Sequence, residues 1–223
     1  MTNNVFFISG IDTGIGKTYA TGLLARALAK RGKHVITQKL VQTGCTEVSE
    51  DIETHRRLQG VPFTQEDKDG VTCPYIFAYP CSPHMAAARE HRTIDFATLD
   101  AYTHTLAQRY DVVLLEGAGG LMVPLHERIL TIDYVATRHY PLILVTCGRL
   151  GSLNHTLLSI EACQTRGIPI AALIYNEYPV EDTEIQQNSL HYLQQRYPDL
   201  PVLLLPPADK GEIDPHTLPD ILL

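Results

Sequence analysis

The stretch GIDTGIGKT, residues 10–18, decides how the fold is interpreted, because it almost matches a phosphate-binding loop. The common form of that loop has one glycine, four further residues and then Gly-Lys-Ser/Thr. Here five residues separate Gly10 from Gly16, and Ile11 stands where the first glycine belongs. The stretch is therefore either a phosphate loop with an unusual entrance or a chance cluster of glycines.

The flanking sequence favours the phosphate loop. VFFISG, residues 5–10, is an apolar strand, and residues 17–32 have helical periodicity and end in a glycine. In this strand–turn–helix order, backbone N–H groups and the helix N-terminus face a bound anion. Lys17 would then reach the terminal phosphates, and the Thr18 hydroxyl would bind Mg²⁺.

Apolar runs and helix-sized segments alternate along the rest of the chain. Strands are predicted at residues 5–10, 34–40, 111–117, 141–148, 168–176 and 200–206, and helices at 17–32, 51–60, 82–90, 154–167 and 181–197. Strands without polar alternation are typical of a parallel sheet with helices on both faces. The pattern predicts one domain over residues 1–223, with an α/β fold of the P-loop NTPase type and a doubly wound, mainly parallel sheet. Residues 61–95 are the least regular, and we expect an insertion there that contacts substrate or covers an edge.

Composition narrows the function classes. The 223 residues are 44% hydrophobic and have a formal net charge of -7, which disfavours broad binding to nucleic acid or anionic lipid. No apolar run approaches the ~18 residues that span a bilayer. The five cysteines form no C-x-x-C pair, and no signal segment precedes residue 5, so we expect a reduced, cytoplasmic protein. The ten histidines show no H-E-x-x-H pattern. We interpret His84 and His155 as structural residues or as residues that support a site residue from behind, and the other eight as solvated or packing residues.

A second element supports a nucleotide site. The apolar strand VVLLEG ends in Glu116, which resembles a strand-end carboxylate that holds Mg²⁺ near a phosphate loop, although Asp is commoner there. EGAGG, residues 116–120, would allow close backbone approach to a ligand. Both elements would meet at the carboxyl edge of the sheet, where open α/β folds bind ligands.

Five segments together resemble those of one known family. Their order and spacing, from Val5 to about Leu205, resemble those of the dethiobiotin synthetases. The segments are GIDTGIGKT, KLVQTG, SPH, EGAGG and RLGSLNH. The family's loop, Gly-x-Asp-Thr-x-x-Gly-Lys-Thr, also has five residues between its glycines. The resemblance implies an ATP-dependent ligase that carboxylates 7,8-diaminopelargonic acid with CO2 and closes its ring to dethiobiotin. The reaction would pass through a carbamate and a carbamic-phosphoric mixed anhydride.

The resemblance also assigns roles to residues. It implies that Lys17 and Lys39 are catalytic and that Thr18, Asp51 and Glu116 bind Mg²⁺. Asp51 is preferred over Glu50 and Glu53 because the family's acid stands at the start of the helix after K-x-V-x-[ST]-G. The same carboxylate could instead be an acid that stabilises the helix N-terminus.

The remaining implied contacts concern ATP and the diamine. The residues implied to bind ATP are Asp12, Thr13, Gly14, Ile15, Gly16, Lys17, Thr18, Asp51, Glu116, Gly117, Ala118, Gly119 and Asn176. Those implied to bind the substrate are Thr13, Lys39, Thr43, Gly119, Leu150, Gly151 and Asn154. The helix start at residues 150–154 would hold the substrate carboxylate from the neighbouring subunit of a homodimer.

The chain departs from the family at a few positions. Leu40 replaces a proline, Gly14 stands where many members have Glu, and Glu177 where Asp is common. The tail LPPADKGEIDPH, residues 205–216, matches poorly, which puts its adenine and ribose contacts in doubt. No departure removes a phosphate-binding, metal-binding or lysine group.

Two other classes of protein share parts of this pattern. A deviant P-loop switch ATPase of the partitioning or septum-site type has a lysine just after the first glycine of its loop, and GIDTGIG has none. An ATP-dependent amidotransferase synthetase needs a glutaminase domain with a nucleophilic cysteine, for which we expect no room in this sequence.

Overall fold

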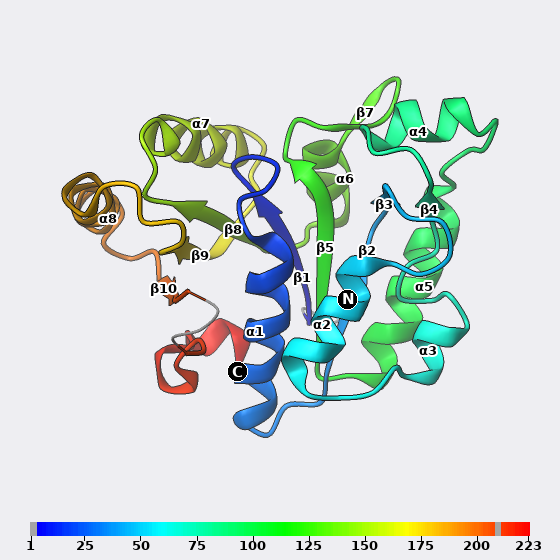
Figure 1. The fold of residues 1–223 in the computed structure, drawn as a ribbon, viewed down its shortest axis with the longest axis horizontal. Coiled ribbons are helices and arrows are strands. Elements are labelled where there is room, and N and C mark those ends of the chain that lie inside the picture. The colour runs from blue at the N-terminus through cyan, green and yellow to red at the C-terminus, as the bar shows by residue number, and fades with distance from the viewer. Residues whose placement is uncertain (1–3, 208–210) are drawn as a thin grey trace.

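The computed structural model describes residues 4–207 and 211–223 and is centred on a six-stranded sheet (Figure 1). Its spatial order is β10-β9-β8-β1-β5-β2, and every neighbouring pair is parallel. The strands are β1 (Val5–Gly10), β2 (Val35–Lys39), β5 (Val112–Gly120), β8 (Leu142–Cys147), β9 (Ile170–Asn176) and β10 (Val202–Leu205). The predicted parallel α/β sheet is confirmed, with each of its six predicted strands present.

Helices cover both faces of this sheet. They are α1 (Lys17–Lys30), α2 (Glu50–Gln59), α3 (Gln65–Lys68), α4 (Pro83–Arg89), α5 (Phe96–Arg109), α6 (Thr131–Arg138), α7 (Ser152–Thr165) and α8 (Thr183–Arg196). The predicted helices correspond to α1, α2, α4, α7 and α8. Neither α5 nor α6 was predicted from the sequence, and α7 begins two residues before the predicted start at residue 154.

Smaller elements complete the chain. The irregular segment 61–95 contains α3, β4 (Ile76–Phe77) and α4, and β4 pairs in parallel with β3 (Gln42–Thr43). A hairpin of β6 (Pro124–His126) and β7 (Ile129–Leu130) follows β5, and short 3-10 turns occupy Pro215–Thr217 and Asp220–Leu222. Of the poorly matching tail, residues 208–210 lie outside the described residues.

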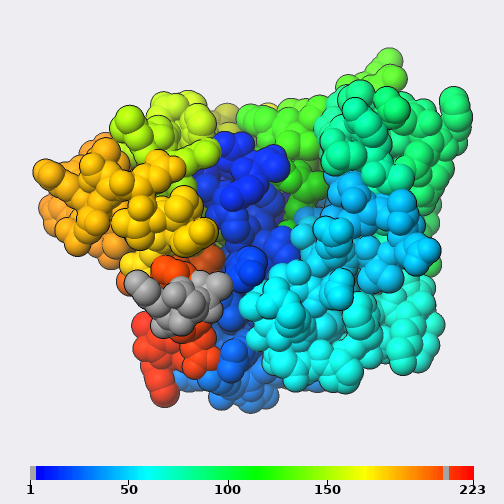
Figure 2. Space-filling view, in the orientation of Figure 1, coloured from blue at the N-terminus to red at the C-terminus, as the bar shows by residue number. Residues whose placement is uncertain are grey.

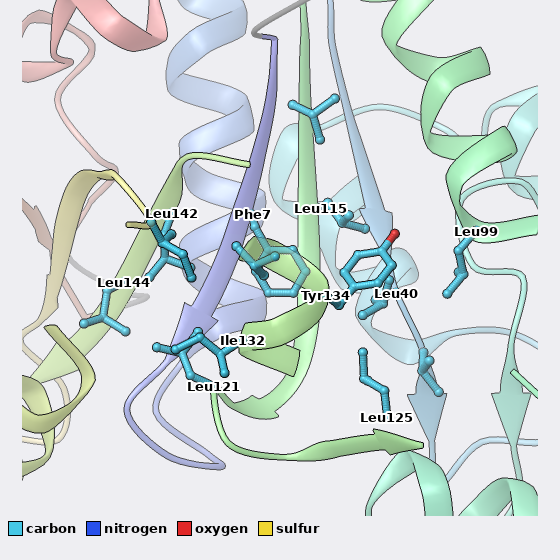
Figure 3. Close-up of a cluster of buried hydrophobic side chains, with 14 of the residues drawn as sticks. Phe7, Leu40, Leu99, Leu115, Leu121, Leu125, Ile132, Tyr134, Leu142 and Leu144 are labelled. Atoms are coloured by element: carbon cyan, nitrogen blue, oxygen red, sulfur yellow. The ribbon is translucent and has the colours of Figure 1, made fainter. Parts of the chain in front are cut away.

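Alternate side chains of each central strand enter different cores. On one face, Phe6 and Ile8 of β1 pack with Leu24 and Leu28 of α1. On the other face, Phe7 belongs to the cluster that holds residues of α5, α6 and α7, and its ring lies 6.5 Å from that of Tyr134 (Figure 3). Because both faces of the sheet are buried, its strands contain no polar alternation.

Between residues 4 and 207 and between 211 and 223, no helix combines the length and the apolarity needed to span a bilayer. All five cysteines are free thiols.

One buried ion pair joins α2 to α3, and its guanidinium also bonds to the sheet. The Arg56 guanidinium donates to both carboxylate oxygens of Asp67, each at 2.7 Å, and both side chains are almost fully buried. Arg56 also donates to the hydroxyl of Thr37 on β2 at 2.8 Å. Burial alone would raise the pKa of Asp67, but hydrogen bonds from Arg56 and Thr72 hold it below its ordinary value of 3.8.

We expect Asp67→Asn to lower the free energy of unfolding by about 3–5 kcal/mol, because it leaves a buried guanidinium without a counter-charge. The stability that the ionised Asp67 contributes is complete above the ordinary carboxyl pKa and is lost as the pH falls through the lowered pKa. Urea unfolding at pH 7 and pH 3 should therefore show a smaller acid loss in the variant. Asp100→Asn, which breaks the more exposed pair with Arg138, is the matched control with an expected loss below about 1 kcal/mol. Equal losses in the two variants would contradict the anchoring role.

Candidate active site

The glycine-rich stretch forms the loop that joins β1 to α1. Gly16 is the N-cap of α1 with φ 95°, and Gly14 has φ 72°, so both adopt the left-handed region that favours glycine. Gly10 is required for a different reason, because a Cβ there would lie 2.4 Å from Cγ2 of Ile15. The predicted strand–loop–helix order is confirmed, and it directs the N-terminus of α1 toward the carboxyl edge of the sheet.

A cavity of about 460 Å³ opens beside this loop. Figure 2 shows the blue N-terminal segment between the cyan segment that includes α2 and the yellow to orange segments that follow β8. The cavity brings together most of the residues assigned from the sequence, namely Thr13, Gly14, Gly16, Lys17, Thr18, Lys39, Thr43, Asp51, Glu116, Ala118 and Gly119. Ile15 is a buried residue of the loop, and the Asp12 side chain lies on the exposed side of the loop.

Strand register explains how Lys39 and Glu116 meet. Lys39 ends β2, and its registered partner on the neighbouring strand β5 is Glu116. The Lys39 Nζ lies 2.8 Å from Glu116 Oε1 and 2.5 Å from Asp51 Oδ2, and it donates to the Gly117 carbonyl at 3.0 Å. Burial alone would lower the pKa of Lys39, but the two carboxylates raise it above its usual value. Lys39 is therefore a permanently charged ammonium at neutral pH.

Three oxygen donors converge next to this ammonium. The Thr18 hydroxyl lies 2.8 Å from Asp51 Oδ1 and 3.3 Å from Glu116 Oε1. Ser49 caps α2, so Asp51 sits in the first turn of that helix, as expected from the sequence. Mg²⁺ prefers hard oxygen ligands and is commonly held by one or two carboxylates together with phosphate oxygens. The donor set of Thr18, Asp51 and Glu116 fits such an ion.

Lys17 supplies a second cation to the same cavity. Its Nζ donates to the Asp12 carbonyl at 3.0 Å, and the side chain is buried. Burial and the neighbouring Lys39 ammonium lower the pKa of Lys17 to about 8. Two ammonium groups and two carboxylates thus share one small space, and an incoming polyanion would relieve the repulsion between the ammonium groups.

The contacts on the side of Glu116 that faces away from the cavity were not predicted from the sequence. His55 Nε2 lies 2.8 Å from Glu116 Oε2, and the Thr21 hydroxyl lies 2.8 Å from the same oxygen. His55 is fully buried and is therefore not solvated, and its contact with Glu116 goes beyond the packing role that was the other interpretation of this histidine. The available signal was its spacing, because a residue four positions after Asp51 lies on the same face of a helix.

Asn176 lies at the end of β9 and lines an adjoining cavity of about 630 Å³. Its amide donates to the Ile15 carbonyl at 3.0 Å, and its side-chain oxygen accepts from the Tyr178 N–H at 3.0 Å. The other walls include Tyr19, Pro179 and Leu205, so the cavity has largely apolar sides next to the loop. Such a slot suits a nucleobase.

The predicted carboxylate-binding residues Leu150, Gly151 and Asn154 do not line either cavity within this chain. Gly151 is the N-cap of α7, and the Leu150 side chain is 80% exposed. The preceding Arg149 forms an ion pair with Asp12 of the loop. The Thr13 backbone N–H and Arg149 lower the pKa of Asp12. Arg149 was also missed, and it ties the start of α7 to the phosphate loop.

Comparisons with known proteins find similar sequences over most of this chain. A family profile described as an AAA domain matches residues 4–216. The chain is 57% identical over 178 residues to the ATP-dependent dethiobiotin synthetase BioD 2 of Haemophilus influenzae, covering 80% of this chain and 93% of the relative. The BioD 2 of Pasteurella multocida is 53% identical, with 86% of this chain and 90% of the relative covered. The BioD of Chlorobaculum tepidum is 56% identical, with 85% and 79% covered.

A solved structure extends the likeness to the fold alone. A ParA family ATPase from Chlorobium tepidum TLS superposes with a TM-score of 0.56 at 17% sequence identity, covering 93% of this chain and 86% of that one. The fold is therefore of the P-loop NTPase type, as predicted.

The two left-handed glycines of the loop give a matched pair of tests. A Cβ on Gly14 meets no heavy atom within 4 Å, whereas a Cβ on Gly16 would lie 2.5 Å from Asn176 Nδ2. Each alanine costs about 1–2 kcal/mol of backbone strain, but Gly16→Ala must also displace Asn176 from Ile15. We expect Gly16→Ala to weaken ATP binding at least about tenfold more than Gly14→Ala, measured by calorimetry. Equal affinities in the two variants would show that Asn176 does not support the loop.

Proposed function

The chain belongs to the ATP-dependent dethiobiotin synthetases, and we propose that the edge of its sheet around the phosphate loop is where the ring is closed. The enzyme is a ligase that makes dethiobiotin from 7,8-diaminopelargonic acid, CO2 and ATP, as its relatives at 53–57% identity indicate. The observation that carries the proposed site is the convergence of Lys17 and Lys39 with two carboxylates beside the loop.

The chemistry needs cations at this place. One amine of the diamine takes up CO2 and loses a proton to become a carbamate. A carbamate oxygen then attacks the γ-phosphorus of ATP and releases ADP, which leaves a carbamic-phosphoric mixed anhydride. The second amine attacks the carbonyl carbon of this anhydride, expels phosphate and loses a proton as the ring closes. In the phosphorylation step a carboxylate-like nucleophile approaches a polyanion, so the enzyme must neutralise negative charge and align the reactants.

The two lysines would perform this task. Lys17 extends from the loop and would bridge the γ-phosphate and the carbamate. Lys39 would stabilise the carbamate and the charge on the transferred phosphoryl group. Its ammonium is already desolvated, which makes each electrostatic contact stronger than it would be in water.

Thr18, Asp51 and Glu116 would hold Mg²⁺, as their converging oxygens suggest. When bound, the ion supplies positive charge to the triphosphate. The slot lined by Asn176 and Tyr178 would accept the base of the nucleotide. Thr13, Thr43 and the Gly117–Gly119 backbone would surround the diamine and the carbamate.

We further propose a homodimer in which α7 of one subunit binds the substrate carboxylate of the other. The first turn of an α-helix leaves backbone N–H groups free for an anion, and Asn154 adds a side-chain amide there. Leu150, Met122 and Leu158 are more than half exposed, and the last two line a groove of about 580 Å³ beside the phosphate loop. Exposed apolar side chains gathered at a groove favour contact with a second subunit.

The alternative of a switch ATPase gains no support beyond the fold. The ParA family ATPase shares architecture at 17% identity, whereas the dethiobiotin synthetases are 53–57% identical to this chain over 79–93% of their own length. Any cytoplasmic location remains a prediction from the composition.

The reaction tests the proposed site directly. Purified protein given the diamine, bicarbonate, Mg²⁺ and ATP should release ADP and a cyclic urea in equal amounts, measured by chromatography and mass spectrometry. Lys39→Ala should lose turnover by about 10²–10³-fold, because one cation facing the transition state is removed. Its ATP affinity should stay within a few-fold of the parent, because Lys17 and the loop amides remain. Normal urea formation by a folded Lys39→Ala enzyme would remove Lys39 from the mechanism.

A charge placed in the groove tests the homodimer. Leu158→Glu should shift the protein from dimer to monomer in sedimentation velocity and raise the KM for the diamine, because the carboxylate site loses its partner. Ile221→Glu, at an exposed apolar position on the C-terminal 3-10 turn, is the control and should do neither. A parent protein that sediments as a monomer while fully active would refute the shared site.

A further inference from the structure

Glu116 divides its two oxygens between two different environments. Oε1 faces the cavity, with the Lys39 ammonium at 2.8 Å and the Thr18 hydroxyl at 3.3 Å. Oε2 faces the protein interior, with His55 Nε2 and the Thr21 hydroxyl each at 2.8 Å. The carboxylate is fully buried, so both oxygens depend on protein donors in place of water.

The hydrogen-bond polarity around His55 follows from its neighbours. The groups that contact the Glu116 carboxylate are the Lys39 ammonium, two hydroxyls and His55 Nε2, and the ammonium pairs with it at 2.8 Å. An ionised carboxylate can only accept, so the proton of this contact resides on His55 Nε2. His55 Nδ1 lies 3.1 Å from the Thr37 hydroxyl, which itself accepts from Arg56 at 2.8 Å. Both ring nitrogens are thus engaged, and the imidazole plane is fixed.

The contacts that fix His55 are themselves held in place by the fold. His55 and Arg56 lie on α2, Thr37 lies on β2, and Arg56 is held by its buried ion pair with Asp67. A chain of contacts therefore runs from Asp67 through Arg56, Thr37 and His55 to Glu116. The last residue in this series of contacts is Glu116, whose Oε1 faces the cavity beside the phosphate loop.

We propose that His55 is a positioning residue for the reaction, which orients Glu116 so that Oε1 is presented to the metal–nucleotide complex. Residues that hold a metal-binding carboxylate from behind commonly change metal affinity by about 10–100-fold when they are removed. The inference rests on the proposed role of Glu116 at the metal. It assigns a functional role to a histidine that is fully buried and lines neither of the two cavities.

Mn²⁺ is the probe for the test, because its electron paramagnetic resonance signal reports binding without turnover. With a non-hydrolysable ATP analogue present, His55→Leu should weaken Mn²⁺ binding about tenfold or more. His55→Gln, which keeps an N–H donor near Nε2, should restore most of that affinity. His191→Leu, at an exposed histidine of α8, is the matched control and should change nothing. Binding of the analogue without metal should be the same in all four proteins.

A double-mutant comparison separates positioning from a general loss of structure. In the Glu116→Gln background, His55→Leu should cause no further loss of Mn²⁺ affinity, because the group through which it acts is already changed. Thermal melting identifies variants that do not fold, and His55→Gln then carries the test. A folded His55→Leu with unchanged Mn²⁺ affinity would overturn the inference, as would an equal further loss in the Glu116→Gln background. Absence of cyclic urea formation in the parent protein would instead refute the proposed function.

Discussion

The buried pair of Glu116 and Lys39 is the interaction on which the site depends. A carboxylate with no exposed surface is stable in its charged form only if cations and hydrogen bonds replace the lost water. Lys39 supplies the cation from the adjacent strand, and the parallel register of β2 and β5 brings the two residues side by side. Exchanging Lys39 alone would leave the buried Glu116 carboxylate without its ammonium partner, whereas exchanging Glu116 alone would leave Lys39 paired with Asp51. Lys39, for which we propose a catalytic role, is therefore also part of what stabilises a charged carboxylate at position 116.

Several elements of this arrangement were predictable from the sequence, because local patterns determine them. Uninterrupted apolar strands indicate a sheet that is buried on both faces, and parallel strands present their carboxyl ends at one edge. These two patterns alone are enough to place the loop and Glu116 together at that edge. The choice of Lys39 and Asp51 depended on the resemblance to the dethiobiotin synthetases. The structure places both side chains against Glu116 or Thr18.

Other elements lacked a local signal. The buried side of α5 consists of Leu99, Thr103, Leu106 and Ala107, of which only two are large and apolar, so the helical pattern is weak. The eight residues of α6 are too few for a clear period. Helix spacing could have placed His55 on the same face as Asp51, but its contact with Glu116 and that of Arg149 with Asp12 join positions 61 and 137 apart in the sequence. Such contacts follow from tertiary packing, and sequence spacing alone does not determine them.

The same geometry explains why position 116 holds a glutamate and not the shorter aspartate. One carboxylate spans the distance between Lys39 on β2 and the pair of Thr21 on α1 and His55 on α2, with contacts of 2.8 Å on both sides. An aspartate at this position is shorter by one carbon–carbon bond, about 1.5 Å. Such a shortening would carry at least one side beyond hydrogen-bond distance. Aspartate is commoner at the end of such a strand, but only the longer Glu116 reaches both Lys39 and His55. The presence of glutamate here and the position of His55 behind it therefore depend on each other.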